Sequence, residues 1–232
     1  MPYFDKSRSL TYSYLISMPL LLVYEVLILI SHPATAVRLS TDIWIKSIFA
    51  VSGQNTIVIT LLVALVLGLV VFYRERHRSL ALKPRHFLAM ILEALIYAVF
   101  LAMLISGFVM WLFAYVQEPG FAATRLQQFT LSLGSGLYEE LVFRVILVGS
   151  LLWLFTRLRI KWWVKHGSAV IIGAVVFSAA HYVGTMGDVF TIGSFIFRFL
   201  FGVALNLIFI YRGFGIAAWT HSLYNLMLWV QS

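Results

Sequence analysis

Seven apolar runs of about 20 residues divide this chain, and they constrain its fold more than any other feature. A helix rises about 1.5 Å per residue, so a run of this length crosses a hydrocarbon core about 30 Å thick. The runs cover residues 12–30, 56–73, 87–116, 129–155, 168–186, 190–211 and 214–230. The sequence therefore predicts an all-α fold, a polytopic membrane bundle of about seven transmembrane helices, with six to eight as the range.

Composition supports the membrane assignment and excludes several other classes. Of the 232 residues, 62% are hydrophobic and 11% are charged, which is not the composition of a soluble domain. The chain has no cysteine, which excludes disulfides, thiolate metal sites and a cysteine nucleophile. The net charge of +8 comes from basic residues in short loops. We therefore interpret it as a topology signal, with the lipid bilayer rather than nucleic acid as partner.

A shorter amphipathic segment covers residues 39–51, where Asp42 and Lys46 are four residues apart. It fits a helix lying on the membrane surface, although half of a re-entrant pair is an alternative. No soluble linker separates the runs, so we expect a single integral-membrane domain. Within it, residues 1–128 would form the N-terminal transmembrane helices and the surface helix, and residues 129–232 the catalytic core.

The basic loops predict an orientation. Residues 74–85 and 157–165 hold most of the Lys and Arg between runs, and seven crossings place both loops on one side. Because positive loops stay preferentially in the cytoplasm, we expect a cytoplasmic N-terminus and an external C-terminus.

Two adjacent carboxylates, Glu139 and Glu140, interrupt the fourth run, and Arg144 follows them. They lie about 10 residues into the run, roughly 15 Å along its axis, near mid-membrane. Glu140 and Arg144 share a helix face, which predicts an ion pair. Glu139 is rotated about 100° away and has no cation on its own helix, so it is available for chemistry. Gly134 and Gly136, just before the pair, would allow close helix approach.

Two later runs carry further polar groups. His181 follows Phe177 by four residues in the fifth run, and His221 precedes Asn225 by four in the seventh. Each alone is typical of interhelical hydrogen bonding or packing, and the ion pair alone is typical of a brace that sets helix register. An unpaired glutamate, two histidines and an asparagine on three spans at comparable depth are costly for packing alone. Together they favour an active site.

Three motifs together resemble the CPBP family of intramembrane proteases, also called ABI, which includes the Ras-converting CAAX endopeptidases. They are Glu-Glu-x-x-x-Arg at 139–144, Phe-x-x-x-His at 177–181 and His-x-x-x-Asn at 221–225. The resemblance covers roughly residues 129–230. It implies an intramembrane endopeptidase in the inner or plasma membrane of a prokaryotic cell, acting on a membrane-embedded or membrane-anchored peptide or protein.

The resemblance also implies a role for each residue. Glu139 would act as general base on a water held between it and His181. His221 and Asn225 would donate hydrogen bonds to the developing oxyanion. The ion pair of Glu140 with the following arginine would hold the fourth helix in register.

Zinc is the open alternative, because Glu139, His181 and His221 would equally form a site of two histidines and one carboxylate. The chain has no His-Glu-x-x-His motif, and carboxylates that could orient zinc-bound histidines are scarce. We therefore expect catalysis without a cofactor, with a zinc metalloendopeptidase as the alternative.

Two other functions remain open at this point. Glu139 and the histidines would also serve as the proton relay of a proton-coupled transporter, or the chain would be a non-catalytic bacteriocin-immunity or scaffold protein. Outside the motifs, Glu25 and Glu93 lie near span ends, where we expect them to reach interfacial water. For Arg198 and Asn206, interhelical hydrogen bonding is favoured over contact with a substrate.

Overall fold

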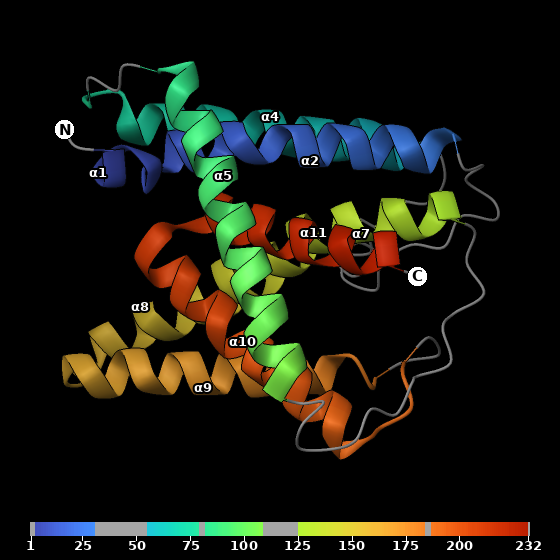
Figure 1. Ribbon diagram of the computed structural model, residues 1–232. Helices are drawn as coiled ribbons and strands as arrows, with labels where there is room; N and C mark the ends of the chain where they lie inside the picture. Colours follow the sequence, from blue (N-terminus) through green and yellow to red (C-terminus); the bar gives the residue numbers. More distant parts are fainter. Residues whose placement is uncertain (1–2, 31–54, 79–81, 109–124, 184–186, 232) are drawn as a thin grey trace.

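The structure is a computed structural model that describes residues 3–30, 55–78, 82–108, 125–183 and 187–231 (Figure 1). Within these ranges every regular element is helical, as predicted. The elements are α1 (Tyr3–Ser7), α2 (Leu10–Ile30), α4 (Asn55–Glu75), α5 (Pro84–Leu101), the π-helix η1 (Ala102–Ser106), α7 (Arg125–Glu140), the π-helix η2 (Leu141–Val148), α8 (Gly149–Arg157), α9 (Trp162–Ala180), α10 (Ile192–Arg212) and α11 (Phe214–Gln231).

These elements correspond to the apolar runs of the sequence, since α7, η2 and α8 follow one another without a break. Five described helices, α2, α4, α5, α9 and α10, are long and apolar enough to cross a membrane. The segments with the acidic pair and with His221 are not among these five, because polar residues interrupt them. The expected surface helix at 39–51 lies outside the described residues.

Helix α11 is the central element, because it packs against α7, α5, α10 and α2. In Figure 1, α2 and α4 lie side by side along one side of the molecule and α9 lies along the other, with α7 and α11 between them. Helices α5 and α10 run obliquely across these layers. The bundle therefore encloses the polar residues of α7 and α11 from both sides.

Close packing of α7 on α11 depends on Gly136. A Cβ atom at this position would collide with the carbonyl oxygen of Ala218 and with the side chain of Ser222. The expected close approach before the acidic pair is therefore observed at Gly136.

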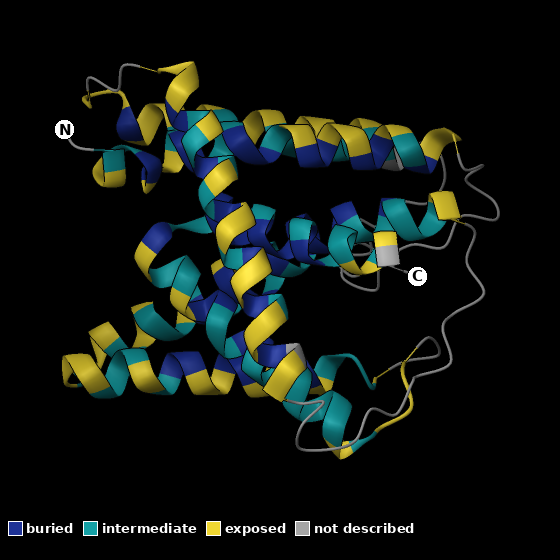
Figure 2. Cartoon of the chain, in the orientation of Figure 1, coloured by how far each residue is buried: buried dark blue, intermediate teal, exposed yellow. Residues whose placement is uncertain are grey.

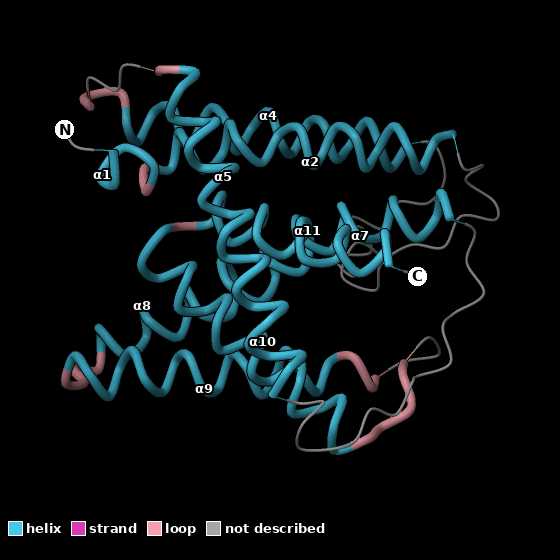
Figure 3. The backbone as a smooth tube through the Cα atoms, in the orientation of Figure 1, coloured by secondary structure: helices cyan, strands magenta, loops and turns pink. Residues whose placement is uncertain are grey.

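The described connections α1–α2, α8–α9 and α10–α11 lie on the same side of the molecule as the N-terminus (Figure 3). The end of α4 and the beginning of α5 lie there too. The C-terminus lies on the other side (Figure 1). The described parts of the two basic loops are thus on one side, as the two crossings between them require. That this side faces the cytoplasm stays a prediction.

An ionic network closes the bundle on the N-terminal side. Arg212, at the end of α10, pairs with Glu93 of α5 and donates to the Ser7 hydroxyl at 2.8 Å. Tyr3 donates to Glu93 at 2.8 Å. Burial, together with this hydrogen bond to a carboxylate, raises the pKa of Tyr3, so its hydroxyl stays protonated. The Glu93 carboxylate is thus bound by residues of α1 and α10, while its side chain is still 15% exposed, so its contact with interfacial water stays a prediction.

The outer surface of α4 is apolar and exposed, as Figure 2 shows for the upper layer. Only 6% of its apolar stretch is buried within the protein. In a soluble protein such a surface would drive aggregation, whereas in a bilayer it faces lipid. This exposure pattern agrees with an integral membrane protein.

Candidate active site

The predicted site residues come together where α7, α9 and α11 meet. Glu139 and Glu140 end α7, and His221 lies on the facing side of α11. His181 directly follows the last residue of α9. It was expected inside a span running to residue 186, but α9 begins earlier, at Trp162, and ends at Ala180. His181 is therefore a helix-terminal residue rather than a mid-helix one.

Glu140 binds two partners through the same oxygen. Its Oε1 lies 2.9 Å from Arg144 Nη1 and 2.7 Å from His221 Nδ1. The first contact is the predicted ion pair. The second was not anticipated, and it joins α7 to α11 through an acid and an imidazole in the protein interior.

Arg144 is fully buried and has a second contact that stabilises its charge. Its guanidinium carbon lies 4.4 Å from the centroid of the Phe177 ring, a cation–π geometry. Among the described residues, none of its guanidinium nitrogens makes a hydrogen bond of good geometry. The charge is therefore held by Glu140 and by the ring of Phe177, which has more than a packing role.

Glu139 faces the two histidines. Its Oε2 lies 3.8 Å from His181 Nε2 and 4.0 Å from His221 Nε2, and the side chain is 13% exposed. Both distances exceed those of a direct hydrogen bond. This buried oxygen has no hydrogen-bond partner among the described residues. A carboxylate oxygen and two imidazole nitrogens thus lie across a gap that one water molecule, about 2.8 Å from each atom, would bridge.

The partners of Nδ1 define the tautomers of both rings. His181 Nδ1 lies 2.9 Å from the carbonyl oxygen of Phe177, and His221 Nδ1 contacts the Glu140 carboxylate. A carbonyl and a carboxylate can only accept, so Nδ1 carries the hydrogen in each ring. Nε2 then presents a lone pair in the neutral ring and donates only when the ring is protonated.

Asn225 lies one turn beyond His221 and faces the preceding turn of α7. Its Nδ2 donates to Ser135 Oγ at 2.6 Å, and Ser135 is four residues before Glu139. The amide has a second N–H, which this bond does not use. Asn225 therefore borders the site, and no described contact joins it to Glu139.

The donor types suit zinc, but their spacing does not. Ligands about 2.0–2.2 Å from a tetrahedral ion lie roughly 3.3 Å apart, closer than the separations from Glu139 to the two rings. No group of three His, Asp or Glu side chains in the described ranges is placed to hold a metal ion. Glu140 contacts the Nδ1 atom of His221, as a carboxylate that orients a zinc-bound histidine would. Such carboxylates were expected to be scarce in this chain.

The site opens on the side of His181, which is 25% exposed whereas His221 is 4% exposed. Next to it, Arg198 donates to Tyr182 at 2.8 Å and pairs with Asp188 at 2.7 Å. The Asp188 N–H donates to the His181 carbonyl oxygen at 2.9 Å. This network therefore ties the end of α9 to α10 and leaves His181 at the entrance.

Asn206, the other residue considered for a substrate contact, donates to the Val170 carbonyl oxygen of α9 at 2.8 Å. It thus makes the interhelical bond favoured from the sequence. Ser135 and Phe201 were not singled out as site residues. Phe201 packs its ring edge-on to His221 with 5.1 Å between centroids. A partner on another helix leaves no spacing signal in the sequence, which is why these contacts escaped prediction.

Fold and site together define an integral membrane protein, a helical bundle with a buried acid–histidine cluster. Residues 121–227 match the model of a family described as type II CAAX prenyl endopeptidase Rce1-like. The C-terminal part of the chain is thus an Rce1-like domain, which confirms the resemblance and indicates a peptidase of the CAAX-protease type. The comparisons with curated proteins and with solved structures found no match.

Proposed function

We propose that this protein is an intramembrane endopeptidase that hydrolyses a peptide bond of a membrane-associated peptide or protein. The observation that carries the proposal is the unpartnered Glu139 oxygen facing the Nε2 atoms of His181 and His221. A buried carboxylate aimed at a water-sized gap between two imidazoles has no use in packing, but it is what water activation requires.

In the proposed reaction, the water donates its hydrogens to Glu139 Oε2 and to the lone pair of His181 Nε2. As its oxygen attacks the carbonyl carbon, one proton passes to Glu139 and the carbonyl oxygen becomes an oxyanion. Glu139 then returns the proton to the leaving nitrogen, and the C–N bond breaks. The products are a carboxylic acid and an amine.

The oxyanion would receive hydrogen bonds from His221 and from the second N–H of Asn225. For His221 this requires a protonated ring, because its Nδ1 hydrogen already faces Glu140. We derive no step through zinc, since the spacing of the three donors does not fit that ion.

Comparing new N termini in membranes tests the base assignment. Membranes with the wild type are compared with membranes carrying Glu139→Gln or His181→Gln, and both variants should lower cleavage by at least about 10²-fold. Full activity of Glu139→Gln would exclude this carboxylate as the base.

His166→Gln is the matched control. On the same helix, His166 Nδ1 lies 2.8 Å from the Trp162 carbonyl oxygen and its ring packs 4.5 Å from the Trp162 ring, the pattern that His181 makes with Phe177. This variant should cleave at the wild-type rate. A chelator should also leave the rate unchanged, and a chelator-sensitive rate would contradict the metal-free mechanism.

A further inference from the structure

Helix α2 precedes the Rce1-like domain in sequence, yet it contacts the helix that carries the proposed base. Tyr138, the residue before Glu139, donates its hydroxyl to Glu25 Oε1 at 2.5 Å. Both side chains are buried, with exposed fractions of 3% and 2%. The expectation that Glu25 reaches interfacial water is therefore wrong, because this carboxylate points into the bundle.

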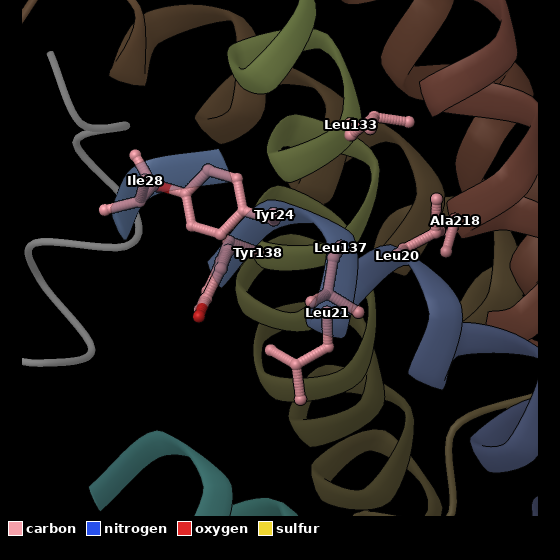
Figure 4. Close-up of a cluster of buried hydrophobic side chains, with 8 residues drawn as sticks. All are labelled: Leu20, Leu21, Tyr24, Ile28, Leu133, Leu137, Tyr138 and Ala218. Atoms are coloured by element: carbon pink, nitrogen blue, oxygen red, sulfur yellow. The ribbon is translucent and has the colours of Figure 1, made fainter. Parts of the chain in front are cut away.

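Tyr138 belongs to a cluster of buried, mostly apolar side chains (Figure 4). The Tyr24 ring packs edge-on against the Tyr138 ring, with centroids 5.2 Å apart. The surrounding cluster joins α2, α7 and α11 and consists of Leu20, Leu21, Tyr24, Ile28, Leu133, Leu137, Tyr138 and Ala218. A hydrogen bond of this kind gains strength from its low-dielectric surroundings.

A carboxylate is an expensive residue for this position if packing is its only purpose. Successive residues of a helix point about 100° apart, so the directions of Tyr138 and Glu139 are coupled. While α2 holds the Tyr138 hydroxyl, Glu139 points from another face of α7 toward the two histidines. The π-helix η2 begins at Leu141, two residues after Glu139. The pattern of backbone hydrogen bonds changes there, so the helix itself least determines how the last turn of α7 is rotated about its axis.

We propose that Glu25 and Tyr138 are positioning residues, whose hydrogen bond sets the rotation of the last turn of α7 and thereby aims Glu139 at His181 and His221. The catalytic consequence rests on the proposed function. The direction of residue 139 does not, and it can be measured without proteolysis.

Thiol labelling measures that direction in the full-length protein. Because the chain has no cysteine, Glu139→Cys creates a unique thiol that a water-soluble methanethiosulfonate reagent can report. Adding Tyr138→Phe should change its labelling rate. The matched control is Tyr14→Phe, since Tyr14 also lies on α2 and donates its hydroxyl to α4, at the Ala64 carbonyl oxygen, 2.8 Å away. Equal labelling rates in the two backgrounds would overturn the inference.

A double variant separates positioning from stability. Replacing both partners of a buried hydrogen bond with apolar groups of similar shape is nearly neutral for folding, so Glu25→Met with Tyr138→Phe should recover the thermal stability lost by Tyr138→Phe. The altered labelling of residue 139 should persist in this pair of substitutions.

The same pair of substitutions, with Glu139 intact, should lower kcat by about 10- to 100-fold with KM unchanged. A farnesylated CAAX peptide serves as the probe. Wild-type labelling and wild-type kcat in the double variant would overturn the inference. A wild type that cleaves neither this peptide nor membrane proteins, with the labelling change intact, would count against the proposed function alone.

Discussion

At the scale of single residues, Glu140 has two tasks that the sequence suggested only in part. The spacing to Arg144 predicted the ion pair, because residues four apart share a helix face. The bond to His221 was not predictable, since it depends on how α7 and α11 cross. The two adjacent carboxylates nevertheless point in different directions, as their positions on the helix predict. Glu140 contacts Arg144 and His221, whereas Glu139 faces the gap beside His181.

Glu140→Gln is expected to destabilise the protein strongly. It leaves the fully buried guanidinium of Arg144 without its countercharge, a loss of about 3–5 kcal/mol for buried pairs. Asp188→Asn is the control, because it breaks an arginine pair whose acid is 44% exposed, and such pairs contribute about 0–1 kcal/mol. Unfolding in mixed detergent micelles measures both losses. Similar losses in the two variants would show that the buried charge is compensated in another way.

At the scale of elements, the crossing of α7 and α11 determines the site. It brings Ser135 to Asn225 and Glu140 to His221, two bonds about one turn apart along the same seam. Gly136 lies in that seam, where α11 leaves no room for a side chain. Over η2, residues 141–148, the chain is π-helical, a widening that often marks functional sites. The apolar pattern of residues 141–148 contains no signal for it.

Gly136→Ala is expected to separate α7 from α11, and overpacking of this kind costs about 1–3 kcal/mol. Gly167→Ala on α9 is the control, since a Cβ atom there meets nothing within 4 Å and alanine favours a helix by about 0.5–1 kcal/mol. Thermal unfolding should rank the control at or above the wild type and Gly136→Ala below it. The reverse order would contradict the close approach of the two helices.

At the scale of the whole molecule, the order of the long helices in the described ranges followed from the apolar runs, whereas their ends did not. The end of α9 is the clearest case, because Ser178, Ala179 and Ala180 continue a helical pattern and no proline or glycine lies between Gly173 and His181. Its beginning was missed for the opposite reason, since Lys165 and His166 mark a polar boundary that the helix nevertheless includes.

The topology predicts which positions share a side of the membrane. In sealed vesicles, single cysteines replacing Lys83 and Arg159 should react with an impermeant thiol reagent from one side, and a cysteine replacing Val189 from the other. All three positions are exposed. In cells the first two should be cytoplasmic if the basic loops determine orientation. Labelling of all three from one side would contradict a crossing of the membrane by α9, which lies between Arg159 and Val189.

The unequal exposure of the two histidines has a consequence for turnover. Every hydrolysis consumes one water molecule, and a bilayer interior supplies none. Among the described residues, the buried ring of His221 and its ion pair lie at the inner end of the site, and the more exposed His181 lies where solvent can enter. Substrate and hydration therefore share one passage, and a peptide that fills it must either carry its water in or leave a channel beside itself.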